Sequence, residues 1–175
     1  MKSTARIAGH PIHPMLIPYP FALLSTATVF DLIERARESH DQFGRRHAFG
    51  QTAGHLLDAG LLTAVVAAVP GIVDYFGSVP RGTRAATDAT WHAAFNSSAL
   101  LTFLLARGER REDGTTSDRG LGLAVLGTML LGAGGWLGGN LVYHHHIGVD
   151  DESPTATLES GHERRQVRPL AQTNM

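Results

Sequence analysis

The stretch GLGLAVLGTMLLGAGGWLGGNLVY, residues 120–143, contains no charged residue. A helix needs about 20 mostly apolar residues to cross the hydrocarbon core of a bilayer, and this stretch meets that length. A helix built from it carries no polar stripe, which a surface helix of a soluble bundle requires. The stretch therefore predicts a transmembrane helix and decides the class of the protein.

Three further apolar runs precede this stretch. Residues 15–30 and 89–106 carry no formal charge, and residues 59–73 are uncharged between Asp58 and Asp74. We expect spans at about residues 14–33, 55–76, 89–106 and 120–143. The predicted fold class is all-α, an integral membrane four-helix bundle formed by residues 1–148. Residues 149–175 contain few large apolar side chains and are expected to form a disordered polar tail.

The composition excludes several classes of protein. The chain has 175 residues, no cysteine and a formal net charge of -1. Without cysteine it forms no disulfide framework and no cysteine-ligated zinc or iron–sulfur site. Without a basic stripe interleaved with aromatic residues, nucleic acid is not an expected partner. We find no nucleophile–base pair, phosphate-binding glycine loop or paired catalytic carboxylates, and therefore do not expect a conventional hydrolase or transferase.

The distribution of lysine and arginine predicts the orientation in the cell inner (plasma) membrane, because short cytoplasmic loops are enriched in these residues. The first and third connectors together carry Arg35, Arg37, Arg45, Arg46, Arg107, Arg110, Arg111 and Arg119. The N-terminal segment and the second connector carry Lys2, Arg6, Arg81 and Arg84. We therefore expect the first and third connectors in the cytoplasm and both termini outside.

This topology gathers histidines near the outer membrane face. His92 is the leading candidate ligand because it lies inside an apolar run, where ionisable groups usually mark function. Two neutral imidazoles from facing helices can be the axial ligands of a b-type haem. The candidate haem ligands are His13, His92, His144, His145 and His146, and further polar residues at the same helix ends are His10 and Asp74.

Two alternatives to haem stay open for these histidines. They can bond backbone carbonyls or lipid headgroups at the membrane interface without any cofactor. A bare metal ion on His144, His145 and His146 is less favoured, because consecutive helical residues point about 100° apart. Asp88, four residues before His92, is expected to cap its helix or to bond the imidazole.

Local features around these histidines carry structural predictions. In GHPIHP, residues 9–14, Pro14 suits the first turn of a helix, where a missing N–H costs nothing. His13 would then stand just before the helix and His10 in an extended segment. In the fourth span Gly134 and Gly138, and Gly135 and Gly139, have the small-xxx-small spacing that permits close approach of a neighbouring helix.

A second polar group lies near the expected cytoplasmic face and consists of Asp31, His55 and Asp58. His55 and Asp58 share a helix face at a spacing of i and i+3, so they can bond each other. As a functional group the three residues suggest a proton path or a cation site. As a structural group they are polar helix ends satisfied by neighbouring helices.

Several motifs resemble one known family. These are GHPIHPMLIPYPFALLSTATVFDLI at residues 9–33, PGIVDYFGSVP at 70–80, WH at 91–92 and GGNLVYHHHIGVD at 138–150. Together they resemble the domain of unknown function 2231 family of bacterial four-helix membrane proteins, over about residues 7–150. Some relatives look like anchors joined to a Rieske-type iron–sulfur domain, which implies a redox association. Since this chain lacks cysteine, any such partner is a separate redox protein.

We expect the lipid bilayer to be a partner of the protein. The sequence supports three functional hypotheses. The first is a redox-associated multi-pass membrane protein that holds a b-type haem near its outer face. The second is a cofactor-free membrane anchor or scaffold. The third is a small proton- or ion-conducting transporter that uses Asp31, His55 and Asp58. Assembly into a homo-oligomer is left open.

Overall fold

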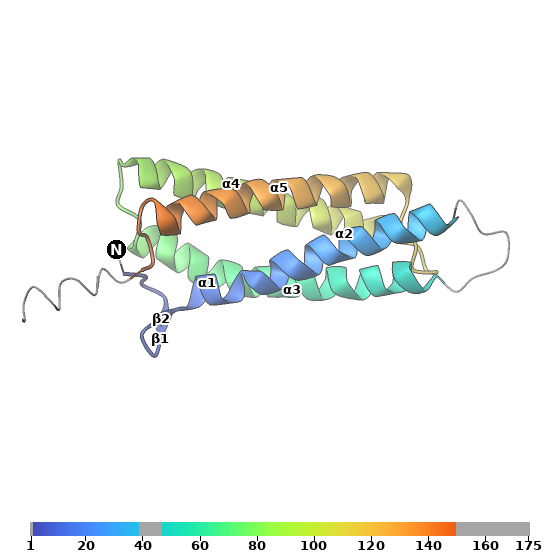
Figure 1. Cartoon of the computed structure of the whole chain (residues 1–175), viewed down its shortest axis with the longest axis horizontal. Coiled ribbons are helices and arrows are strands. Elements are labelled where there is room, and N and C mark those ends of the chain that lie inside the picture. Colours follow the sequence, from blue (N-terminus) through green and yellow to red (C-terminus); the bar gives the residue numbers. More distant parts are fainter. Residues whose placement is uncertain (1, 39–46, 150–175) are drawn as a thin grey trace, which may run out of the picture.

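The computed structural model describes residues 2–38 and 47–149 (Figure 1). Within them the chain forms a two-stranded antiparallel hairpin and then helices. The elements are β1 Arg6–Ile7, β2 His10–Pro11, α1 Ile12–Leu16, α2 Pro18–Glu38, α3 Ala48–Gly77, α4 Arg84–Gly108 and α5 Asp118–Tyr143. The predicted all-α four-helix architecture is confirmed, with α1 and α2 together forming the first long segment. The tail predicted to be disordered lies, from residue 150 on, outside the described residues.

Three of the four long segments in the described residues are long and apolar enough to cross a membrane. They are Ile12–Arg37, Ala48–Gly77 and Asp118–Tyr143. The helix α4 contains the predicted span 89–106 and is long enough, but it falls short in composition because polar side chains such as His92 and Asn96 interrupt it. Since α4 packs along α5 (Figure 1), the four-span arrangement remains our interpretation.

The helices pack as two antiparallel pairs. Figure 1 shows α2 beside α3 and α4 beside α5, and contacts within each pair are more extensive than those between the pairs. Glycines permit the close approach: a Cβ on Gly60 would lie 2.7 Å from Leu24, and one on Gly127 would lie 2.9 Å from Phe103. Leu24 and Phe103 are the largest fully buried side chains. The core is therefore narrow and built around small residues, as in membrane bundles.

Large apolar side chains point outward along the bundle. Leu62, Val69, Met129 and Trp136 are each more than 60% exposed. A soluble monomer rarely leaves so continuous an apolar surface in water, whereas lipid solvates it without cost. The outward face of the bundle therefore fits a hydrocarbon environment.

The two ends of the bundle differ in their polar groups, and we name them after these groups. The histidine end comprises residues 2–14, 71–92 and 134–149, and the arginine end comprises residues 31–38, 47–58 and 107–120. Both ends of the described chain lie at the histidine end (Figure 1). The first and last described residues therefore lie on the same side of the bundle, as expected for a chain that crosses the membrane four times. Their placement outside the cell stays a prediction.

The β1–β2 hairpin leads the chain into α1. Ile7 pairs with His10, and the two turn residues Ala8 and Gly9 have left-handed backbones with φ of 47° and 85°. His10 is thus in an extended segment, as the proline spacing predicts. The helix α1 begins at Ile12, so Pro14 lies in its first turn as expected, but His13 lies inside that turn instead of before it.

Candidate functional site

Two histidines from opposite helix pairs meet at the histidine end. His13 comes from α1, which packs on α3, and His92 comes from α4, which packs on α5. Their ring centroids are 6.2 Å apart and the ring planes are perpendicular. Both residues are partly buried. Of the five predicted haem ligands, the structure therefore brings these two together.

Each of the two imidazoles is fixed by a backbone carbonyl. His13 Nδ1 lies 2.8 Å from the carbonyl oxygen of Ala67 in α3, and His92 Nδ1 lies 2.8 Å from that of Gly134 in α5. A carbonyl oxygen only accepts, so Nδ1 carries the proton in both rings. In a neutral imidazole this leaves the Nε2 lone pair available as an acceptor or a metal ligand.

Glycines make room for both rings. A Cβ on Gly71 would lie 2.8 Å from two ring atoms of His13, and a Cβ on Gly138 would lie 3.0 Å from the His92 ring. A Cβ on Gly134 would lie 2.6 Å from Asn96 Nδ2. The glycine pair Gly134 and Gly138 therefore seats polar side chains of α4 on the backbone of α5. In the sequence, only the Pro70–Gly71 pair indicated that α3 has room for the His13 ring.

Asn96 was not among the predicted site residues, yet it borders the His92 ring. Its Nδ2 donates to the backbone carbonyl of His92 over 2.8 Å and lies 3.4 Å from His92 Nε2. The second distance exceeds the ordinary N–H···N range, so it is at most a weak bond. The spacing of four residues from His92 on one helix face was the signal for this contact.

The other predicted ligands lie apart from this pair. His144 is the C-cap of α5 and is exposed, and its ring centroid is 6.4 Å from that of His145. His145 Nε2 lies 2.8 Å from Asp88 Oδ2, so this histidine ties the end of α5 to α4. The expectation that Asp88 caps α4 or bonds His92 is wrong, because Thr83 caps that helix and Asp88 faces the α5 terminus. His146 is exposed, with a left-handed φ of 51°.

His10 and Asp74 also lie apart from the histidine pair. His10 is exposed in β2. The Asp74 carboxylate accepts hydrogen bonds from Ser3 Oγ at 2.8 Å, from the Thr4 N–H at 2.7 Å and from the Ala5 N–H at 2.9 Å. Asp74 therefore fastens the N-terminal segment to the end of α3. Within residues 2–38 and 47–149 no group of three or more His, Asp or Glu side chains is placed to hold a metal ion.

At the arginine end, the three residues Asp31, His55 and Asp58 are not brought together. Asp31 Oδ2 accepts from Arg110 Nη2 over 2.7 Å, and both side chains are about 95% buried. Asp58 faces outward and is paired with Arg107. His55 is exposed on α3. The arginine partners could not be predicted from sequence because they lie far along the chain from Asp31 and Asp58.

The connector between α4 and α5 contains a carboxylate held by its own loop. Asp113 Oδ1 accepts from the backbone N–H of Thr115 over 2.8 Å and from its hydroxyl over 2.7 Å. These bonds stabilise the charged form and lower the pKa of Asp113 below its ordinary value. The connector is thereby fixed beside the end of α2, where Arg35 donates to the Thr116 carbonyl.

The comparison with known families supports the architecture. Residues 9–151 match the family described as "Predicted membrane protein (DUF2231)", which is domain of unknown function 2231. The chain belongs to this family. No curated protein and no solved structure matches it. This DUF2231 chain is therefore a multi-pass membrane protein, and its bilayer contact follows from that family and from the three candidate spans.

Proposed function

We propose that the protein is a membrane-embedded redox protein in which His13 and His92 are the axial ligands of one b-type haem. The observation that carries the proposal is the geometry of the pair: two imidazoles from opposite helix pairs, with centroids 6.2 Å apart. Two ring nitrogens that each lie about 2 Å from one metal ion place the ring centroids about 6 Å apart. The centroid separation of the His13–His92 pair matches this value, which supports two imidazole ligands on one iron.

The composition of the site favours haem over a bare metal ion. A structural zinc site uses four protein ligands, and no cluster of even three such side chains is present in the described residues. A haem brings four nitrogen ligands of its own and needs only two from the protein. Two imidazoles without a third ligand match this requirement.

The surrounding residues do what supporting groups of a haem ligand must do. The carbonyls of Ala67 and Gly134 hold each Nδ1–H, which orients the ring and makes Nε2 more basic. Gly71 and Gly138 let the rings sit against the helix backbones. When bound, a haem supplies one-electron transfer, and a position near one membrane face suits exchange with a separate redox protein.

A second candidate function is a cofactor-free anchor or scaffold. It is favoured by one observation: each Nδ1 bond lies within one helix pair, α1 to α3 for His13 and α4 to α5 for His92. Such bonds stabilise each pair whether or not a ligand is present. In this interpretation the two rings meet only because the pairs pack together.

The experiment is a visible absorption spectrum of the full chain purified in mild detergent, oxidised and then reduced with dithionite, before and after titration with hemin. We expect a Soret band with sharp α and β bands on reduction, at one haem per chain. His92→Gln removes the ligand but keeps a donor for the Gly134 carbonyl. The His92→Gln and His13→Gln variants should each lose the six-coordinate spectrum. His55→Gln, on the exposed face of α3, is the matched control. A preparation that is colourless as purified, and in which added hemin keeps the spectrum of free hemin in the same detergent, contradicts the haem proposal and favours the scaffold.

A further inference from the structure

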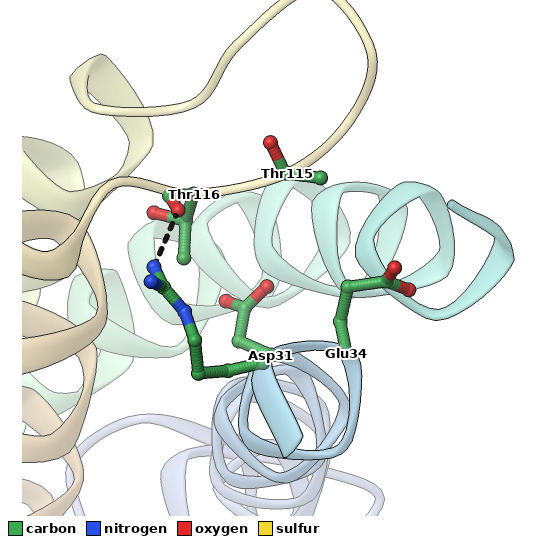
Figure 2. Close-up of a pocket in the computed structure, with 5 residues that line it drawn as sticks. Asp31, Glu34, Thr115 and Thr116 are labelled. Carbon is green, nitrogen blue, oxygen red and sulfur yellow. Dashed lines mark hydrogen bonds between the residues drawn. The ribbon is translucent and has the colours of Figure 1, made fainter. Parts of the chain in front are cut away.

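A small cavity lies at the arginine end, remote from the histidine pair. It has a volume of about 10 Å³, enough for one water-sized occupant. Figure 2 shows Asp31 and Glu34 rising from α2 toward the connector that carries Thr115 and Thr116. We call this space the Asp31 cavity; its walls are Asp31, Glu34, Arg35, Thr115 and Thr116.

The Asp31 carboxylate has unused capacity beside this cavity. Its side chain is 4% exposed, and Oδ2 is bonded to Arg110. Oδ1 is buried and has no hydrogen-bond partner among the described residues. Arg110 Nη1 donates to the carbonyls of Gly50 and Gly114, and Arg110 Nε is also buried without a hydrogen-bond partner among the described residues. A buried carboxylate oxygen without a donor or a cation is costly, so an occupant of the cavity that satisfies it is stabilised.

Among the described residues, the charged groups around the cavity form two ion pairs and leave one further carboxylate. Arg110 is paired with Asp31, and Arg35 is paired with Asp118 over 2.6 Å. Glu34 is the remaining carboxylate, and it accepts from His47 Nδ1 and from the Gly50 N–H over 3.0 Å each. A positive charge in the cavity would interact favourably with the Asp31 and Glu34 carboxylates that line it.

We propose that the Asp31 cavity binds one small monovalent cation, either Na⁺ or an excess proton. The cavity walls offer the carboxylate oxygens of Asp31 and Glu34 and the hydroxyl oxygens of the two threonines, and hard cations prefer oxygen ligands. The volume of one water admits a dehydrated Na⁺ or a protonated water, but not a larger organic cation. The proposal does not depend on haem binding, since it uses different residues at the other end of the bundle.

Several titratable and charged groups from the neighbouring elements face this site and bear on any pH dependence. They are Glu34 and Arg35 on α2, His47 before α3, Arg110, Arg111 and Asp113 after α4, and Asp118 on α5. The comparison of a variant with the wild type at each pH isolates the contribution of Asp31 from that of these groups.

The test is the unfolding temperature of the full chain in detergent, in NaCl and in choline chloride at equal ionic strength. A site selective for Na⁺ raises the wild-type unfolding temperature in proportion to the logarithm of the Na⁺ concentration. Asp31→Asn should abolish this shift and Glu34→Gln should reduce it. Asp58→Asn, an exposed carboxylate on α3, should keep the full shift.

A proton as the bound cation gives a different result. The wild type then shows no difference between Na⁺ and choline, but it gains stability relative to Asp31→Asn as the pH falls. If Asp31→Asn does not fold, Glu34→Gln measured against Asp58→Asn gives the same comparison. An unfolding temperature that is insensitive to Na⁺, with the same pH dependence in wild type and both cavity variants, overturns the proposal. In that case Oδ1 closes a second bond with Arg110.

Discussion

The two ends of the bundle hold buried polar groups in different ways. At the arginine end a carboxylate is paired with a guanidinium group, Asp31 with Arg110, across α2 and the segment after α4. At the histidine end His13 and His92 are bonded to backbone carbonyls instead of to opposite charges. In an ion pair each partner neutralises the charge of the other. A hydrogen bond to a backbone carbonyl occupies only one of the two nitrogens of an imidazole. The histidine end therefore keeps two ring nitrogens available for a ligand, and the arginine end keeps one carboxylate oxygen.

The largest expected effect tests the buried ion pair. Arg110→Met leaves Asp31 charged and buried without a partner, which should lower the free energy of unfolding by about 3–5 kcal/mol. Arg107→Met is the matched control, because its ion pair with Asp58 is about half exposed and is expected to contribute at most about 1 kcal/mol. Denaturant unfolding in detergent measures both. Equal losses in the two variants would mean that burial does not distinguish the pairs.

Substitution of the glycines that contact the His13 and His92 rings should give the next largest loss of stability. Gly71→Ala and Gly138→Ala drive a methyl group against the His13 and His92 rings, and such overpacking costs about 1–3 kcal/mol. Gly139→Ala is the control, since its Cβ would meet no described atom within 4 Å and alanine favours helix. The free energy of unfolding and hemin binding should both fall in the first two variants alone. Unchanged hemin affinity in them would separate these glycines from the proposed site.

Loss of the hydrogen bonds that Asp74 accepts from the N-terminal segment should destabilise that segment locally. Asp74→Ala removes the acceptor of the Thr4 and Ala5 amides, at a cost of about 1–3 kcal/mol to the attachment of the N-terminal segment. Amide hydrogen exchange at these two residues should accelerate by about tenfold or more, while exchange in the centre of α4 stays unchanged. Protection that persists in the variant would show that the hairpin is held by other contacts.

The smallest expected effect concerns the connector at the arginine end. The lowered pKa of Asp113 means that its bonds with Thr115 stabilise the fold above the ordinary aspartate pKa, and that this contribution is lost as the pH falls through the lowered value. Thr115→Val removes the hydroxyl donor and keeps the backbone N–H, so the Asp113 pKa should rise toward its ordinary value. Carbon-13 NMR titration of the carboxyl group measures the change. An unchanged titration would assign the lowering to the backbone bond alone.

The fold could be predicted from the sequence because membrane spans depend on long apolar runs, which are local. Residues 120–143 predict α5 from their composition alone, without any information on tertiary contacts. The composition of α4 was the exception, because His92, Asn96 and the serines beside it reduce its hydropathy. His92 and Asn96 face α5, where they contact the backbone at Gly134 and Gly138. Polar residues inside a bundle therefore make a genuine bundle helix look less like a span.

The candidate site could be predicted only in part. His92 and His13 stood out because ionisable groups are rare in apolar segments. Which histidine faces which depends on helix rotation and crossing, so His145 and Asp88 could not be paired from sequence. The partners of Asp31 and Asp58 lie 79 and 49 residues away, and no local pattern reports such a distance.

The most direct test of the central claim is the low-temperature electron paramagnetic resonance spectrum of the oxidised, hemin-loaded protein. Two imidazole ligands with perpendicular ring planes, as in the His13–His92 pair, predict a low-spin ferric signal with large anisotropy. The same signal should disappear in His92→Gln and persist in His55→Gln. A high-spin signal, or a low-spin signal unaffected by His92→Gln, would contradict the assignment of this pair as haem ligands.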